Sequence, residues 1–213
     1  MDIQRQIEEV GRSVELRGSE DEAALTVTQE YDVSVEDLWD ACTNADRIPR
    51  WFLPITGELR EGGTYQLEGN AGGRVLRCEP PRSFQVTWEY GGEVSEVEVR
   101  LTALSDTRSR FALTHFAPLN DFWAQFGPGA TGIGWEMGLL GLRQHLSSGV
   151  DIPPEAAEWA ASEEARRFME LSGRMWGRAH AAAGADPEEA AVSAERTIAA
   201  YTATPGEESA SGA

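Results

Sequence analysis

One stretch between two glycines, residues 127–149, constrains the fold of this chain more than any other. Pro128 suits a first helical turn, where no backbone N–H is needed, and Gly149 suits a C-terminal cap. Between them an apolar stripe recurs at the helical spacing i, i+4, i+7 and i+11, formed by Trp135, Leu139, Leu142 and Leu146. The spacing predicts one long helix over residues 128–148 that packs this face on a larger apolar surface.

The two flanks of the predicted helix differ in composition. Gly134, Gly138 and Gly141 follow one flank, and each glycine costs about 1 kcal/mol relative to alanine in a helix interior. Such a row indicates that a backbone or a ligand comes close there. The other flank carries a second apolar patch, formed by Ile133, Met137 and Leu140. We therefore expect a sheet under the first stripe and a C-terminal helical layer over the second patch.

Most of the chain before this helix has the pattern of short strands joined by tight turns. Residues 1–21 are charged and weakly patterned, apart from a short edge strand near Val14. Residues 24–33 alternate apolar and polar side chains, which predicts a strand with one buried face. Ser34 then suits an N-cap, and two short helices follow. From Pro54 the period of 2 resumes, and tight turns divide it into about six strands of an antiparallel sheet.

This order of elements predicts the fold class and the domain organisation. Residues 1–149 are expected to form one α+β domain, a curved antiparallel sheet of about six to seven strands wrapped around the long helix, with a cavity between them. Residues 150–203 are expected to add two helices that pack on this domain, beginning after the caps Ser162 and Asp186. Residues 204–213 are small and polar, and we predict that they are disordered.

Charge and composition argue against several classes of partner. The net charge is −18, and all 18 basic residues are arginine, whereas binding to nucleic acid or an anionic membrane needs clustered positive charge. The chain has no run of about 18 apolar residues and no apolar signal region, so we expect a cytoplasmic protein that spans no membrane. Cys42 and Cys78 are expected to be buried, reduced thiols. They and three scattered histidines match no metal-ligand spacing, so we expect no metal and no cofactor.

Several segments taken together resemble a known family. They are YDVSVEDLWDACTNADRIPRWF, GGTY, GGRVLRCEPPRSFQVTW, VEVRL, DTRSRFALTHF and GWEMGLLGL. In order and spacing over about residues 22–148, they resemble the activator-of-heat-shock-protein-90-ATPase homology family. That family belongs to the START-like, helix-grip (SRPBCC) superfamily of the major birch-pollen allergen and the polyketide cyclases. The resemblance implies the helix-grip fold with an internal apolar cavity, but no single activity, since the fold hosts carriers, cyclases, hydrolases and chaperone cofactors.

The inward face of the sheet and the long helix supply the candidate ligand-binding residues. We expect this set to comprise Tyr65, Trp88, Val97, Val99, Phe111, Leu113, His115, Phe122, Trp123, Trp135, Gly138 and Leu139. The aromatic loop at 117–126 would close the cavity as a lid, and His115 would be its main polar anchor. Tyr65 and Ser95 are further polar groups on apolar strand faces. The alternative for all three is an ordinary core side chain whose hydrogen bonds are satisfied within the protein.

Three functions remain open at the level of sequence. Binding of a small apolar or aromatic molecule is favoured, because the inward set is aromatic with few polar groups. An alternative is an enzyme of the cyclase or hydrolase type with His115 as general base, although no recognisable catalytic set identifies the catalytic residues. Another is a chaperone cofactor or protein-interaction module, which would expose an apolar patch. The expected partner is a small hydrophobic ligand, and a homodimer is also compatible with the sequence.

Overall fold

The computed structural model describes residues 3–17, 21–148 and 159–203. In chain order its elements are α1 (Ile3–Glu9), β1 (Gly11–Arg17), β2 (Glu22–Tyr31), α2 (Val35–Thr43), the short 3-10 helix η1 (Ile48–Arg50), β3 (Ile55–Gly57), β4 (Thr64–Leu67), β5 (Gly72–Glu79), β6 (Ser83–Tyr90), β7 (Glu93–Ser105), β8 (Arg108–Pro118), α3 (Asp121–Phe126), α4 (Gly129–Ser148), α6 (Glu163–Ala182) and α7 (Pro187–Thr202). The predicted succession of strand, two short helices, six strands and long helix is confirmed. The predicted domain boundary at 149–150 and the predicted disordered tail, 204–213, lie outside the described residues.

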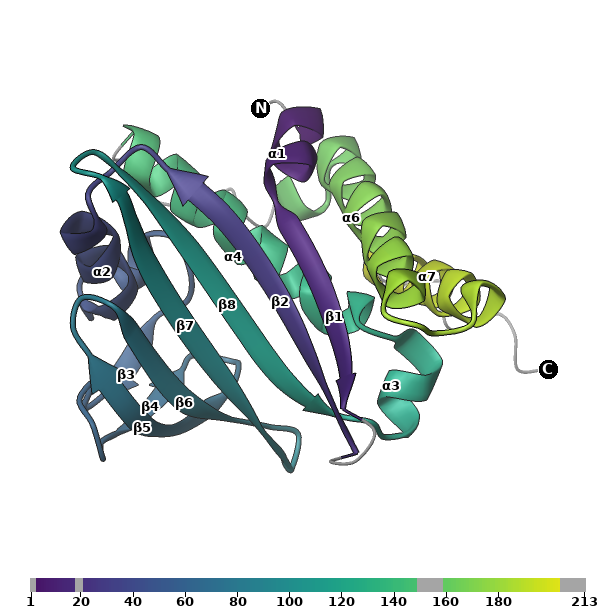
Figure 1. The fold of residues 1–213 in the computed structure, drawn as a ribbon, viewed down its shortest axis with the longest axis horizontal. Helices are drawn as coiled ribbons and strands as arrows, with labels where there is room; N and C mark the ends of the chain where they lie inside the picture. Colours follow the sequence, from purple (N-terminus) through teal and green to yellow (C-terminus); the bar gives the residue numbers. More distant parts are fainter. Residues whose placement is uncertain (1–2, 18–20, 149–158, 204–213) are drawn as a thin grey trace.

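The strands of the described residues form one eight-stranded antiparallel sheet in the order β1-β2-β8-β7-β6-β5-β4-β3 (Figure 1). The early strand β2 pairs with the late strand β8, so that Leu25 lies opposite His115, and Val97 of β7 lies opposite His115 on its other side. The sheet exceeds the predicted six to seven strands, because β1 and the short β3 both extend its edges. The predicted helix-grip architecture is confirmed.

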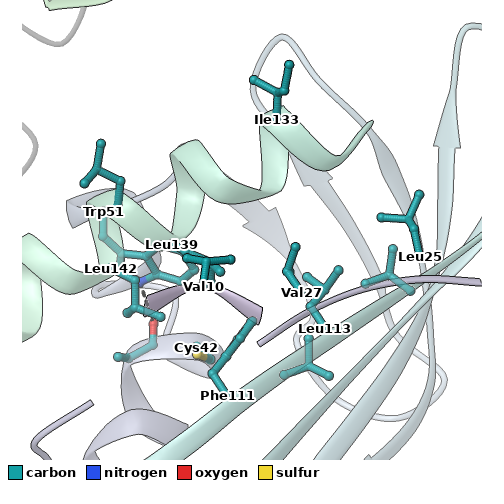
Figure 2. Packing of buried hydrophobic residues seen from close by; sticks show 14 of the residues in the cluster. Val10, Leu25, Val27, Cys42, Trp51, Phe111, Leu113, Ile133, Leu139 and Leu142 are labelled. Atoms are coloured by element: carbon teal, nitrogen blue, oxygen red, sulfur yellow. Dashed lines mark hydrogen bonds between the residues drawn. The ribbon is translucent and has the colours of Figure 1, made fainter. Parts of the chain in front are cut away.

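The helix α4 lies against one face of this sheet, as its apolar stripe predicts. Leu139 and Leu142 are buried in one core with side chains from β2 and β8, among them Leu25, Val27, Phe111 and Leu113 (Figure 2). Each fully buried side chain of this size contributes roughly 1.5–3 kcal/mol to folding. Trp51, next to η1, closes the core by donating an indole hydrogen bond to the carbonyl of Ala41 at 2.9 Å.

The helices α6 and α7 form the predicted C-terminal layer beyond the β1 edge of the sheet (Figure 1). Both begin at the predicted caps. Ser162 Oγ accepts a hydrogen bond from the backbone N–H of Ala165 at 3.1 Å, and Asp186 Oδ1 accepts from that of Glu188 at 2.9 Å. These bonds satisfy amide groups that the first helical turn leaves without partners.

The contact between α4 and α6 is unusually close. A Cβ placed on Gly132 would lie 2.1 Å from the ring of Trp176, which is fully buried. Ile133 is buried next to this contact, as predicted for the second apolar patch. Leu140 of the same patch is also buried in the core, whereas Met137 is only partly buried, and both side chains line a cavity. Helical geometry accounts for the exposure of Met137, which lies nearer the glycine flank than Ile133 does.

A buried ion pair joins the N-terminal segment to α4, and sequence inspection did not predict it. Glu136 of α4 and Arg12 of β1 have side chains that are 0% and 3% exposed. Arg12 Nε donates to Glu136 Oε1 at 2.6 Å, a second bond joins Nη2 to Oε2, and Arg12 Nη1 donates to the carbonyls of Ile7 and Val10. The pair is tolerated in the interior because Nη1, the guanidinium nitrogen that does not face Glu136, is also hydrogen-bonded.

Two helices occur where the sequence predicts none. Residues 1–21 appeared weakly patterned, yet α1 buries Ile3 and Ile7, an i, i+4 pair, together with Gln6. The predicted aromatic loop contains α3, which begins because Asn120 Oδ1 accepts the N–H of Trp123 at 3.0 Å. It ends at Gly127, whose φ of 61° favours glycine.

Candidate ligand-binding cavity

A cavity of about 800 Å³ lies between the sheet, α4 and α3. Its sheet wall comes from β6, β7 and β8, and its helix wall comes from the glycine flank of α4. Its lining includes Trp51, Phe52, Leu53, Asn70, Trp88, Tyr90, Glu93, Ser95, His115, Asn120, Phe122, Trp123, Gly134, Trp135, Met137, Gly138, Leu140, Gly141, Gln144, Trp159 and Tyr201. Cavities of 300–1,000 Å³ with mostly apolar walls are typical of small-molecule sites.

Aromatic rings form the central wall of the cavity. The ring centroids of Trp88 and Trp135 are 4.8 Å apart, and Phe52 stacks on Trp135 at 6.1 Å. Trp88 also meets the ring of His115 edge-on at 6.2 Å. Such tilted and offset contacts are the arrangements that aromatic pairs prefer. They hold the rings in fixed positions next to the empty volume.

The glycine flank of α4 faces this volume and does not fill it. A Cβ on Gly134 would meet only the hydroxyl of Tyr201, at 3.5 Å, and a Cβ on Gly138 would meet the ring of Phe52, at 3.3 Å. The close approach predicted for these glycines is therefore made by side chains, not by a strand backbone. The missing side chains leave part of the cavity open.

His115 is the centre of a hydrogen-bonded chain in the cavity wall. The indole N–H of Trp135 donates to His115 Nδ1 at 3.1 Å, and His115 Nε2 lies 2.8 Å from Ser95 Oγ. Since indole is a donor only, Nδ1 must be the acceptor and Nε2 must carry the proton. Ser95 Oγ in turn donates to the carbonyl of Trp88 at 3.2 Å. Every polar atom of the imidazole is therefore used within the protein.

Burial sets the charge of this histidine. Desolvation lowers the pKa of His115 to about 4, because the charged imidazolium would lose its hydration. The ring is neutral near pH 7, and neither nitrogen is free to accept a proton or a ligand hydrogen bond without breaking the chain. The bonding matches the core-histidine alternative more closely than the predicted polar anchor. His115 presents its ring to the cavity instead.

A second, smaller cavity of about 130 Å³ lies behind the aromatic wall. Four aromatic residues, Trp51, Phe52, Trp88 and Trp135, line both cavities. Tyr65, which also lines the smaller one, donates its hydroxyl to the carbonyl of Thr87 at 2.7 Å, and burial raises the pKa of Tyr65. Neither Cys42 nor Cys78 forms a disulfide, as predicted. Only Cys42 is fully buried, so the predicted burial of Cys78 is wrong.

The predicted site residues divide between the two cavities. Those that line the larger one are Trp88, His115, Phe122, Trp123, Trp135 and Gly138. Those that line the smaller one are Tyr65, Trp88, Val97, Val99, Phe111, Leu113 and Trp135. Leu139 lines neither, because it is packed in the core. Sequence reasoning missed Phe52, Trp159 and Tyr201, although the aromatic pair Trp51-Phe52 before the strands was a signal that could have found the first.

The mouth of the larger cavity is formed by α3 and the β6–β7 hairpin. Phe122 and Tyr90 are 54% and 61% exposed, so the cavity opens to solvent beside them. The amide nitrogen of Asn120 donates to both carboxylate oxygens of Glu93, at 2.9 and 3.0 Å, which ties α3 to β7. Trp123 packs edge-on against His180 of α6 at 5.6 Å. The segment that was predicted to act as a lid therefore contains a helix that contacts β7 through Asn120 and α6 through Trp123.

Two classes of site have no counterpart in the described residues. Within 3–17, 21–148 and 159–203, no three histidine, cysteine, aspartate or glutamate side chains gather in a way that could hold a metal ion. In the same residues, none of the helices combines the length and the apolar character needed to cross a lipid bilayer.

Comparisons with known proteins agree with this geometry. The model of a family described as Activator of Hsp90 ATPase homolog 1-like protein matches residues 32–147, more than half of the chain. The crystal structure of CalU16 from Micromonospora echinospora is 34% identical, with a TM-score of 0.62 over 80% of this chain and 97% of that chain. The solution structure of CalU16 gives 32% identity and a TM-score of 0.67, over 82% and 97%. A conserved protein of Enterococcus faecalis, 15% identical over 83% and 95%, shares the fold with a TM-score of 0.61. A search of curated proteins finds no match.

Proposed function

The chain belongs to the family of Activator of Hsp90 ATPase homolog 1-like proteins, and we propose that it binds a small apolar or aromatic molecule in the larger cavity. The observation that most supports this function is an empty volume of about 800 Å³ beside a fixed aromatic wall. A concave, mostly apolar pocket of this size that opens to solvent is the usual form of a small-molecule site.

The wall also indicates how the molecule would be held. His115 and Ser95 are already hydrogen-bonded to protein groups, so they do not compete for polar atoms of a ligand. Binding energy would come from burial of apolar area, at roughly 25 cal/mol per Å², and from contacts with the rings of Trp88, Trp135 and Phe52. The ligand class is therefore defined by shape and aromatic surface more than by a pattern of hydrogen bonds.

The enzyme alternative uses the same cavity and depends on His115. A general base works best with a pKa near the working pH and a free nitrogen within reach of the substrate. Burial lowers the pKa of His115 to about 4, and both of its nitrogens are bonded. Binding without turnover is the function that these contacts support.

Titration with a neutral aromatic probe tests the proposed function. N-phenyl-1-naphthylamine, whose fluorescence rises in apolar surroundings, should bind saturably with one molecule per chain. Gly138→Leu, which places a large side chain beside Phe52 in the cavity, should weaken binding at least tenfold. Ala200→Leu, which places the same side chain at an exposed position of α7, is the control and should bind like the unaltered chain.

A second variant separates loss of binding from loss of folding. Thr131→Trp fills the cavity from another position of its lining on α4. Thermal unfolding of each variant should show a cooperative transition, which establishes that the fold is kept. Non-saturable binding to the unaltered chain, or folded Gly138→Leu and Thr131→Trp variants that bind the probe with undiminished affinity, would overturn the function.

A further inference from the structure

The charged groups around the larger cavity are of one sign. Glu93 is the one residue with a charged side chain at neutral pH among the described residues that line it, and it lies at the mouth. No arginine belongs to the described lining, and the chain contains no lysine. His115, the one histidine of that lining, is neutral near pH 7 because its ring is desolvated. An anion entering this cavity would lose its hydration without gaining a cationic partner.

The arginines that contact α4 are already bonded to other side chains. Arg47, which meets His145 of α4 at 3.4 Å, donates to Asp37 and Asp40. Arg12 is bound to Glu136, which lies about 180° around the helix from the glycine flank. Arg143, also on the far side of α4, donates to Gln6 and Glu9. Satisfying an anion in the cavity would require one of these side chains to leave a buried or paired position. These arginines are therefore not available to neutralise an anion in the cavity.

Two features of the cavity favour a positive charge instead. Asn120 orients the carboxylate of Glu93 by donating to both of its oxygens, at 2.9 and 3.0 Å, and lone pairs remain for a further donor. The rings of five tryptophans line the same space: Trp51, Trp88, Trp123, Trp135 and Trp159. The face of an indole attracts a cation within about 6 Å of its centre. The net charge of −18 adds a field that draws cations towards the whole surface.

From this arrangement we infer that the cavity selects a planar aromatic amine, with its ring system against Trp88, Trp135 and Phe52 and its ammonium group towards Glu93. Neutral aromatic molecules of the same shape bind more weakly, and aromatic carboxylates are excluded. This inference rests on the proposed function, since it names the chemical class that the same cavity takes. It adds a selectivity for charge that binding of an apolar molecule does not require.

Three probes with one ring system test the selectivity. 2-Naphthylmethylamine is a cation at pH 7, 2-naphthalenemethanol is neutral and 2-naphthoate is an anion. Calorimetric titrations of the full chain should give the tightest Kd for the amine, about fivefold below that of the alcohol, which corresponds to one cation–aromatic contact of about 1 kcal/mol. The naphthoate should bind at least tenfold more weakly than the alcohol.

A neutral side chain in place of Glu93 tests whether this carboxylate is the source of the selectivity. Glu93→Gln keeps a group of the same shape beside Asn120 and should bring the amine towards the affinity of the alcohol, with the alcohol unchanged. Glu195→Gln removes one negative charge from an exposed position of α7 and is the matched control for net charge. It should leave all three affinities and the amine-to-alcohol ratio as they are.

The outcomes separate this inference from the function on which it rests. Saturable binding of all three probes with equal affinity, or a carboxylate that binds as tightly as the amine, overturns the selectivity and leaves the binding function standing. An amine-to-alcohol ratio unchanged by Glu93→Gln overturns the role of Glu93. Absence of saturable binding for every probe overturns the proposed function itself.

Discussion

The two sides of α4 use the same residue type for opposite purposes. On one side, Gly132 lets α6 come so close that a Cβ would lie 2.1 Å from the ring of Trp176. On the other side, Gly134 and Gly138 face a cavity of about 800 Å³. Glycine weakens a helix in both cases. On the first side, close packing against α6 offsets the helix stability that glycine costs. On the second side, no such packing offsets this cost within the described residues.

The difference explains which side supplies stability and which supplies a site. The packed side also holds the Arg12–Glu136 pair, with every bond inside the protein. The open side carries aromatic surface that the described residues do not cover. Natural proteins retain such unfilled surface where function needs it, at a cost in stability. The same substitution should therefore act in opposite directions on the two sides.

The largest effect is expected from breaking the ion pair on the packed side. Glu136→Ala leaves the guanidinium of Arg12, only 3% exposed, without its counter-ion. Loss of one partner of a buried pair costs about 3–5 kcal/mol, because the other charge remains buried. Urea unfolding should measure this loss. Glu195→Ala, at an exposed position, should change the free energy of unfolding by less than about 0.5 kcal/mol, and a similarly small change for Glu136→Ala would contradict the account.

A smaller effect, of opposite sign on the two sides, is expected from adding one methyl group. Gly132→Ala drives a Cβ into the ring of Trp176 and should destabilise the chain by about 1–3 kcal/mol. Gly134→Ala meets only the hydroxyl of Tyr201 at 3.5 Å, so it should gain helix propensity and stabilise the chain by up to about 1 kcal/mol. Thermal or urea unfolding of both variants gives the signs. If both variants lowered the free energy of unfolding by the same amount, the distinction between the packed side and the open side would be contradicted.

The pH dependence of stability should reveal the desolvated ring on the open side. The pKa of His115 is about 4 in the folded chain, below its usual value, so the unfolded chain binds more protons between about pH 6.5 and 4. The contribution of His115 to the free energy of unfolding is fully present above about pH 6.5. It decreases as the pH falls from about 6.5 to 4. The loss should be on the order of 2 kcal/mol by pH 4.5.

The variant His115→Gln isolates this contribution, because an amide can bond to Trp135 and Ser95 without titrating. Subtracting its unfolding free energies from those of the unaltered chain, pH by pH, removes the carboxylates and His180 from the comparison. A difference that does not change between pH 7 and 4.5 would show that His115 titrates normally and lies in water.

Much of the fold could be predicted from local patterns, but the polar part of the site could not. The period of 2 and the spacing from Trp135 to Leu146 mark the strands and the long helix within windows of a few residues. The Arg12–Glu136 pair joins residues 124 positions apart, and nothing in either neighbourhood indicates the other. Likewise the partners of His115 come from β7 and α4, so the sequence showed an inward histidine and not that its nitrogens were already used.

The lining of the cavity shows the same limit. Inward strand positions such as Trp88 could be read from alternation, because a strand places every second side chain on one face. Phe52 and Tyr201 reach the cavity from a turn after η1 and from the last helix, and their positions depend on how whole elements pack. Leu139 was predicted to line the cavity but is packed in the core. A helical stripe shows which side chains are buried, but not which of them line a cavity.

The most direct test follows the indole N–H signals of the seven tryptophans by ¹H–¹⁵N NMR while N-phenyl-1-naphthylamine is added. If the open side of α4 is a ligand site, the signals of Trp88, Trp123 and Trp135 shift in a saturable way, and that of Trp176, buried against Gly132, stays in place. Single Trp→Phe variants assign the signals. Shifts confined to Trp176, or no saturable shift at Trp88 and Trp135, would contradict the central claim that one side of this helix is packed and the other is built to bind.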